Sequence, residues 1–207
     1  MSKTTSLLFD LGGVIMDIDR RRCEAAFERI GFGDIGEFLG DFGQKGAFAQ
    51  LESGQISPAE FRAAIRRHID GKVSDAQIDA AFEQFLTGIP ARRLDALLRL
   101  RRRYKVYLLS NTNAIMWNGF IAESFRQQGL QTDDYFDGTV TSFEARCLKP
   151  SAQIFEYTAR KLGIEPAETM FFDDSEANCR AAEACGYQAA HVRPGVEFTD
   201  IIREKGL

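Results

Sequence analysis

The sequence has only two histidines and four cysteines among its 207 residues. The cysteines, Cys23, Cys147, Cys179 and Cys185, form no C-x-x-C pair, so neither a zinc site nor a redox motif is expected. No apolar run approaches the roughly 20 residues that cross a bilayer, and the first residues do not have the pattern of a secretory signal. We therefore expect reduced thiols, a cytoplasmic location and no membrane partner.

An excess of positive charge is also missing. The chain carries 26 Lys and Arg against 30 Asp and Glu, a net charge of -4, which argues against a nucleic-acid partner because such proteins neutralise phosphates with a basic surface. Its composition, 44% hydrophobic and 27% charged, is that of a folded globular protein and excludes a disordered or collagenous chain. The length predicts one compact domain that carries an insertion.

Short apolar runs bounded by turn signals alternate with segments of helical periodicity. One such helical stripe runs from Ile154 to Leu162 and is followed by Gly163, a typical stop. Repeated strand-helix units predict an α/β fold, a Rossmann-like, doubly wound parallel sheet core in three layers. The expected strands are residues 6–9, 106–109, 138–142, 170–172 and 189–192.

Residues 20–90 break this rhythm, because they contain no good strand pattern and several helix starts. Ser57 with Glu60 and Ser74 with Gln77 have the spacing of capping boxes. We expect an inserted, all-helical cap domain at residues 19–90, and an α/β core domain made of residues 1–18 and 91–207. Since the insertion follows the first strand closely, it is expected to cover the end of that strand as a lid.

Polar residues follow three of the predicted strands. Asp10 ends the first, Ser110 and Asn111 end the second, and the pair Asp173-Asp174 ends a later one, while Lys149 precedes Pro150 just ahead of a helix. Each alone could be a turn former, a helix cap or a solvated charge. Adjacent carboxylates repel each other, however, and a bound Mg²⁺ is the usual way in which a protein compensates this repulsion. In a parallel sheet these points converge at one edge.

Together these segments resemble the haloacid dehalogenase superfamily of aspartate-based phosphotransferases. The matching stretches are Phe9 to Val14, Leu109 to Asn111, Lys149-Pro150, and Phe172 to Ser175 with Asn178. The position of the helical insertion is similar to that in the subgroup that includes beta-phosphoglucomutase-like and hexose-phosphate phosphatase-like proteins.

The resemblance implies a role for each matching residue. Asp10 would attack phosphorus and form an aspartyl phosphate that water hydrolyses, with Lys149 and Ser110 as further catalytic residues. The remaining roles concern the bound phosphate ester and the metal. Leu11, Gly12 and Asn111, through backbone N–H groups, together with Ser110 and Lys149, would bind the substrate, and Asp10, Asp173, Asp174 and the Gly12 carbonyl would hold Mg²⁺.

One position departs from the family pattern. The usual general acid and base is a second aspartate two residues after the nucleophile, and here that position is Gly12. Protonation of the leaving oxygen must then come from elsewhere, or be unnecessary because the leaving group is good, as in a sugar 1-phosphate. Asp17 and Asp19 are close enough in sequence to substitute, although they could equally cap or solvate the first cap helix.

These observations predict a Mg²⁺-dependent phosphatase that hydrolyses a small phosphorylated metabolite, with a sugar phosphate as the expected class. A beta-phosphoglucomutase-like phosphotransferase and a catalytically silent phosphate-binding module are the alternatives, and dehalogenation, which needs no metal, fits less well. Gln44, Lys45 and Phe48 could project from the cap into the cleft or cover the cap's own core. The sequence carries no prediction of the oligomeric state.

Overall fold

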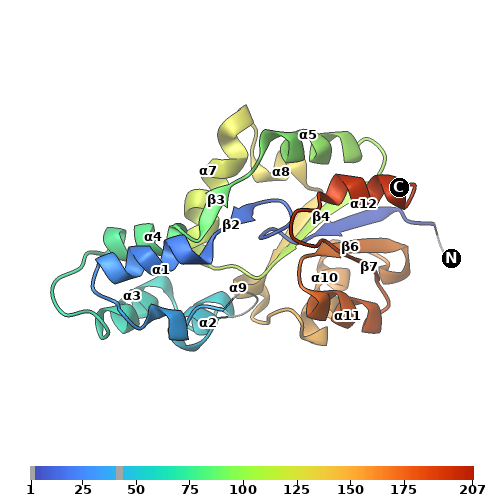
Figure 1. Cartoon of the computed structure of the whole chain (residues 1–207). Helices are drawn as coiled ribbons and strands as arrows, with labels where there is room; N and C mark the ends of the chain where they lie inside the picture. The colour runs from blue at the N-terminus through green and yellow to red at the C-terminus, as the bar shows by residue number, and fades with distance from the viewer. Residues whose placement is uncertain (1–2, 41–43) are drawn as a thin grey trace.

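A five-stranded parallel sheet forms the centre of the computed structural model, which describes residues 3–40 and 44–207 (Figure 1). Its strand order, β5-β4-β1-β6-β7, places the first strand in the middle. All neighbouring strands are parallel, so their carboxyl ends share one edge. The strands are β1 (Ser6–Phe9), β4 (Lys105–Ser110), β5 (Gly138–Thr141), β6 (Thr169–Asp173) and β7 (Gln188–His191).

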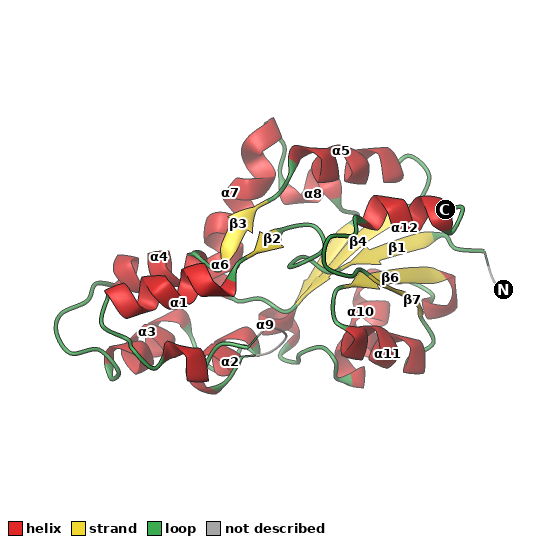
Figure 2. Ribbon diagram, viewed as in Figure 1, coloured by secondary structure: helices red, strands yellow, loops and turns green. Residues whose placement is uncertain are grey.

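Helices cover both faces of this sheet (Figure 2). Along β1 the side chains alternate: Leu7 and Phe9 pack into one apolar cluster and Leu8 into another. Because both faces are covered, β1 is fully buried, and its residues Leu7 to Phe9 are all apolar. The first face is covered by α5 (Ala91–Leu100) and α12 (Phe198–Glu204), and the second by α10 (Ala152–Leu162) and α11 (Glu176–Ala184). The predicted three-layer α/β fold is confirmed.

The predicted strands of the sheet agree with the observed ones to within one residue at each end. The expected stop at Gly163 is also confirmed, because this residue ends α10 with a left-handed φ of 64°. The longer connections carry short elements: α6 (Ala114–Met116), α7 (Ala122–Phe125), α8 (Thr132–Tyr135), α9 (Ser142–Ala145), the π-helical turn Trp117–Ile121, and the 3-10 turns Ile35–Glu37, Arg126–Gln128 and Pro166–Glu168.

Four helices lie beyond the carboxyl end of the sheet, on the left in Figure 1: α1 (Arg20–Arg29), α2 (Gly46–Glu52), α3 (Pro58–Arg66) and α4 (Asp75–Glu83). Both capping boxes are present, at Ser57 and Ser74. Buried phenylalanines from all four helices join them. Phe48 is central, with its ring centroid 5.0 Å from those of both Phe61 and Phe82. The division into a core and a cap domain at residues 18/19 and 90/91 stays a prediction.

The expectation that residues 20–90 contain no strand was wrong. β3 (Leu86–Gly88) pairs antiparallel with β2 (Asp17–Ile18), where the chain leaves and re-enters the sheet region. Strands of two and three residues are too short to show alternation in a sequence. The buried guanidinium of Arg93 fixes this pair, because its Nη1 lies 2.7 Å from Asp17 Oδ1 and 3.1 Å from the carbonyl oxygen of Ile15.

A seam joins α2 to the sheet region. The Oγ of Ser142, which begins α9, donates to the carbonyl oxygen of Glu52 over 2.7 Å. Two residues later Gly54 has a left-handed φ of 66°, and a Cβ there would lie 2.2 Å from the carbonyl oxygen of Phe143. Only glycine therefore permits this approach. Within the described ranges no helix is long and apolar enough to cross a membrane.

Candidate active site

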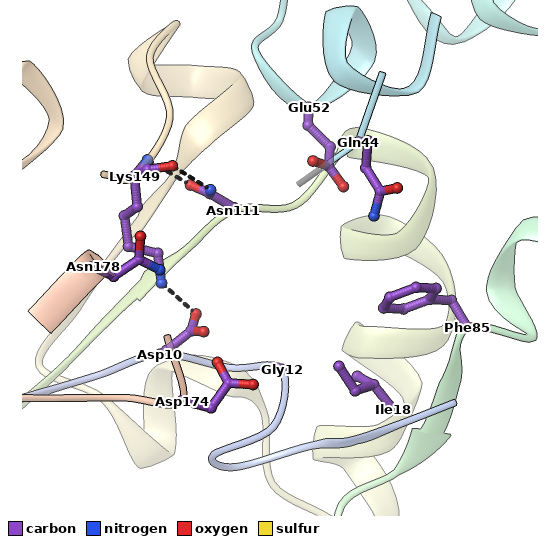
Figure 3. Close-up of a pocket in the computed structure, with 10 residues that line it drawn as sticks. All are labelled: Asp10, Gly12, Ile18, Gln44, Glu52, Phe85, Asn111, Lys149, Asp174 and Asn178. Atoms are coloured by element: carbon purple, nitrogen blue, oxygen red, sulfur yellow. Dashed lines mark hydrogen bonds and ion pairs between the residues drawn. The ribbon is translucent and has the colours of Figure 1, made fainter. Parts of the chain in front are cut away.

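Four of the predicted site residues meet at the carboxyl edge of the sheet. Asp10 follows β1, Asn111 follows β4, Asp174 follows β6, and Lys149 lies on the connection between α9 and α10. All four line one cavity of about 90 Å³ (Figure 3). The other lining residues are Gly12, Ile18, Gln44, Glu52, Phe85 and Asn178. The predicted convergence of separate strand ends is therefore observed.

Lys149 is the positive centre of the site and is 4% exposed. Its Nζ lies 2.7 Å from Asp10 Oδ1 and 2.7 Å from Asp173 Oδ2, and it donates to the Leu109 carbonyl oxygen over 3.1 Å. Burial acts to lower the pKa of this ammonium group, but Asp10 and Asp173 outweigh it and the net pKa is raised. The three ammonium hydrogens thus have three acceptors, which hold Lys149 charged and fixed in place.

Asp173 is fully buried and completes this arrangement. Besides the bond to Lys149 it accepts hydrogen bonds at Oδ1 from the Ser175 N–H, over 2.8 Å, and from Asn178 Nδ2, over 2.9 Å. These donors hold the Asp173 carboxylate in one orientation. In addition to its predicted part in metal binding, Asp173 therefore orients the Lys149 ammonium group.

Asn111 holds the same lysine through the backbone. Its Nδ2 donates to the Lys149 carbonyl oxygen over 3.0 Å, and its Oδ1 accepts from the Lys149 N–H over 2.9 Å. This reciprocal pair ties the end of β4 to the loop that bears Lys149. The side chain of Asn111 is therefore occupied with positioning, which leaves its backbone N–H for the predicted phosphate contact.

The donor set at this edge fits a divalent cation. Carboxylate oxygens of Asp10, Asp173 and Asp174 lie within 4.8 Å of one another. Burial, partly opposed by Lys149, raises the pKa of Asp10 to about 8, with Asp173 and Asp174 adding to the shift. Burial and the charge of Asp173 raise the pKa of Asp174 to about 6. One ammonium group cannot compensate three carboxylates, and hard oxygen ligands of this kind suit Mg²⁺.

The turn after β1 offers backbone donors to an anion. Among the described residues no partner is present for the N–H groups of Leu11, Gly12 and Asn111, which were predicted to bind phosphate. Ser110 ends β4 and is buried, with its Oγ 3.4 Å from the Asn111 carbonyl oxygen. It does not belong to the lining of the cavity described above. The roles of these four residues stay predictions.

Gly13 leaves room for the Asp174 carboxylate, a predicted metal ligand. It has a left-handed φ of 73°, and a Cβ there would lie 2.2 Å from Asp174 Oδ2. We expect Gly13→Ala to displace the Asp174 carboxylate and weaken Mg²⁺ binding by about 10- to 100-fold, as loss of a supporting contact at a metal site typically does. Isothermal titration with Mg²⁺ measures this change.

The matched control is Gly129→Ala. Gly129 has a similar φ of 76° but no atom within 4 Å of its Cβ position. Both variants carry the backbone strain, at about 1 to 3 kcal/mol each, and only Gly13→Ala adds the collision. Equal Mg²⁺ affinity in the two variants would contradict the assignment of Asp174 as a metal ligand.

The structure shows where the side chains lie for which the sequence left two roles open. Asp17 forms an ion pair with Arg93, and Asp19 caps α1 by accepting from the N–H groups of Arg21 and Arg22. Neither belongs to the lining of the cavity that contains Asp10. Of the cap residues, Gln44 lines the cavity, Lys45 is exposed, and Phe48 is buried in the phenylalanine cluster.

Sequence reasoning missed Glu52, Ile18 and Phe85 as lining residues. Figure 3 shows the Glu52 carboxyl entering the cavity from α2, opposite Asp10. The sequence showed Glu52 only as part of a turn with Ser53 and Gly54. A second hollow of about 650 Å³ adjoins the first and shares Ile18, Phe85 and Asp174 with it. It can receive the part of a ligand that extends from the inner cavity.

Comparison with known proteins supports the same chemistry. The model of a family described as haloacid dehalogenase-like hydrolase matches residues 5–186. A D-ribitol-5-phosphate phosphatase from Bacteroides thetaiotaomicron is 32% identical over 193 residues, which cover 93% of this chain and 94% of the relative. A wild-type HAD family enzyme from Bacteroides thetaiotaomicron, solved in complex with magnesium and inorganic phosphate, is 43% identical, with a TM-score of 0.90 over 97% of this chain and 100% of that one. A predicted HAD-like family hydrolase from Porphyromonas gingivalis is 33% identical, with a TM-score of 0.91 over 99% and 98% of the two chains.

Proposed function

This chain belongs to the haloacid dehalogenase-like hydrolase family, and on that premise we propose that it is a Mg²⁺-dependent phosphatase that acts on a phosphorylated sugar or sugar alcohol. The observation that carries the proposal is the contact of Lys149 Nζ with both Asp10 and Asp173, 2.7 Å from each, beside Asp174 in one cavity. This arrangement combines a nucleophilic carboxylate, a fixed positive charge and an oxygen-rich cation site.

The reaction begins when a phosphate monoester enters with its phosphoryl group near Asp10. The N–H groups of Leu11, Gly12 and Asn111 and the Lys149 ammonium group offer hydrogen bonds to the phosphoryl oxygens. A carboxylate oxygen of Asp10 attacks phosphorus as the ester bond breaks, and the alcohol departs. Water then attacks the phosphorus of the aspartyl phosphate, which releases inorganic phosphate and restores the Asp10 carboxylate.

Mg²⁺ would be held by Asp10, Asp174, the Gly12 carbonyl and, directly or through water, Asp173. When bound, it cancels the charge that Lys149 leaves uncompensated and polarises a phosphoryl oxygen. The raised pKa of Asp10 supports this requirement, because a carboxyl with a pKa of about 8 is largely protonated at neutral pH and a poor nucleophile.

The lining of the cavity supports a small polar substrate. The inner cavity measures about 90 Å³ and adjoins the larger hollow of about 650 Å³. The Gln44 amide lines the cavity beside Glu52, and Ile18 and Phe85 form an apolar wall (Figure 3). Amides donate to and accept from hydroxyl groups. The similarity to a D-ribitol-5-phosphate phosphatase supports the same substrate class.

The test is release of inorganic phosphate from a panel of phosphate esters with Mg²⁺ and with chelator. The panel contains aldose 1-phosphates, hexose and pentose phosphates, and alditol 5-phosphates. We expect Mg²⁺-dependent release from at least one hydroxylated substrate. Transfer of phosphate to a sugar hydroxyl in preference to water would instead indicate a phosphotransferase. Tight binding of phosphate and Mg²⁺ without turnover would indicate a silent binding module.

Without a cation, we expect the protein to lose stability as the pH rises. The pKa of Asp10 is about 8 and that of Asp174 about 6, against 3.8 for an unperturbed aspartate. Between these values the folded state binds more protons than the unfolded state, so the free energy of unfolding falls with rising pH. Saturating Mg²⁺ is expected to reverse the trend and add about 2.7 kcal/mol at 100 times its Kd.

Thermal melting between about pH 5 and pH 8, with Mg²⁺ or with NaCl of equal ionic strength, measures this effect. The stabilisation by Mg²⁺ should be larger at the alkaline end because the ligands must be deprotonated to bind. A stabilisation by Mg²⁺ that is independent of pH would contradict the assignment of the metal to these carboxylates.

A further inference from the structure

The site lacks an acid at the position where the family usually has one, and nothing in the backbone forces that absence. A Cβ at Gly12 would meet only methyl groups of Ile18, at 3.5 and 4.0 Å, and its φ is outside the left-handed region. The two acidic side chains nearest in sequence are used elsewhere: Asp17 pairs with Arg93 and Asp19 caps α1. Another group must therefore supply the proton to an alkoxide leaving group.

The residues that line the cavity limit which group can be the proton donor. The amides of Gln44, Asn111 and Asn178 do not titrate, and Ile18 and Phe85 are apolar. Lys149 is held between two carboxylates and the Leu109 carbonyl. Asp10 is the nucleophile, and Asp174 lies in the acidic cluster that holds the cation. Among the described lining residues, Glu52 remains.

Glu52 is suited to proton transfer by its position. It is the last residue of α2, half-buried, and its carboxyl enters the cavity opposite Asp10 (Figure 3). Within the described chain its carboxyl has no hydrogen-bond or ion-pair partner, so neither form of the group is committed to another contact. Phe48, one helical turn earlier, anchors the helix in the phenylalanine cluster, and the seam to Ser142 fixes its end.

We propose that Glu52 takes over the task of the missing second aspartate, as the general acid for the departing alcohol and then as the general base for water. The inference rests on the proposed phosphatase function. Burial raises the pKa of the Glu52 carboxyl to about 8, so the group carries its proton at neutral pH when a substrate arrives. A general acid with a pKa near the working pH is the most effective one.

The proton moves as follows. In the first step Asp10 Oδ forms a bond to phosphorus, the bond from phosphorus to the ester oxygen breaks, and that oxygen receives the Glu52 proton and leaves as an alcohol. In the second step Glu52, now a carboxylate, accepts a proton from water while the water oxygen bonds to phosphorus and the bond to Asp10 breaks. The products are an alcohol and inorganic phosphate, and Glu52 is again protonated.

The test compares two leaving groups in wild type and Glu52→Gln. An alkyl phosphate, such as the best substrate of the panel, needs protonation of its leaving oxygen, whereas 4-nitrophenyl phosphate releases a stable anion and does not. We expect kcat/KM of Glu52→Gln to fall by about 10²- to 10⁴-fold with the alkyl phosphate and to stay within about threefold with 4-nitrophenyl phosphate. Phosphorylated Asp10 should accumulate in this variant, detected by mass spectrometry, because water attack lacks its base.

Glu28→Gln, an exposed position on α1, is the matched control and is expected to behave as wild type with both esters. Thermal melting and Mg²⁺ binding establish that Glu52→Gln is folded. An equal loss with both esters would assign Glu52 to substrate placement and overturn the proposal, as would an unchanged kcat/KM with the alkyl phosphate. Failure of the proposed function is distinct, because wild type would then hydrolyse neither ester.

Discussion

Asp10→Asn is expected to lower the turnover of every phosphate ester by about 10⁴-fold or more, the loss that follows removal of a nucleophile. An amide oxygen is a poor nucleophile, so no aspartyl phosphate forms. The fold should be retained. Asn has the size of the neutral carboxyl, and the raised pKa of Asp10 shows that burial already favours the neutral form. Phosphate release and mass spectrometry of the protein after mixing with substrate measure the effect.

Asp70→Asn is a suitable control, because Asp70 is exposed in the turn that follows α3. It removes the same charge from the protein without touching the cavity. Phosphate release that persists in Asp10→Asn at more than about one hundredth of the wild-type rate would show that another group attacks phosphorus. The mechanism proposed above would then be wrong at its first step.

Lys149→Met is expected to reduce both stability and activity strongly. It leaves Asp10 and Asp173 buried without their shared cation, and removing one partner of a buried ion pair costs about 3 to 5 kcal/mol. Methionine fills much of the same space, so the loss of stability measures the missing charge more than a change in side-chain volume. Activity should fall as well, because Asp10 loses the contact at 2.7 Å that orients it and favours its ionised form.

Lys105→Met makes the same exchange at a surface pair. Lys105 Nζ lies 3.1 Å from Asp137 Oδ1, but its side chain is 66% exposed, so the expected cost is below about 1 kcal/mol. Urea denaturation of both variants gives the comparison. Similar losses in free energy of unfolding would mean that Lys149 is not the electrostatic centre of the site. Mg²⁺ should recover part of the loss in Lys149→Met, since both cations compensate the same carboxylates.

The core and the convergence of its strand ends could be predicted from the sequence because they depend on local signals. The apolar run from Leu7 to Phe9 identifies β1 as an interior strand, and Asp10 then falls at its carboxyl end. The same reasoning applies to β4 and β6. Parallel pairing brings these ends to one edge whatever the details of side-chain packing. The residue types then indicated a cation site, since few other arrangements compensate the repulsion between the adjacent carboxylates of Asp173 and Asp174.

What the sequence could not show depends on contacts between distant segments. Glu52 reaches the cavity only because the turn after α2 docks against Phe143, an approach that Gly54 permits. No periodicity in residues 46–54 reveals which side chain faces the cavity. The same limit applies to Asp17: its pairing with Arg93 joins positions 76 residues apart, so the sequence alone left open whether it replaces the missing acid.

The seam between α2 and α9 bears on which molecules can be consumed. The attacking carboxylate and the cation ligands follow the strands of the sheet, whereas Glu52 comes from the helical group and is brought to them where Ser142 and Gly54 close the gap. Glu52 lies on one side of the seam and Asp10 on the other. An ester too bulky to fit between them would bind through its phosphate but would dissociate without being hydrolysed. Docking of the two parts would thus act as a size filter that rejects oversized esters after binding and before cleavage.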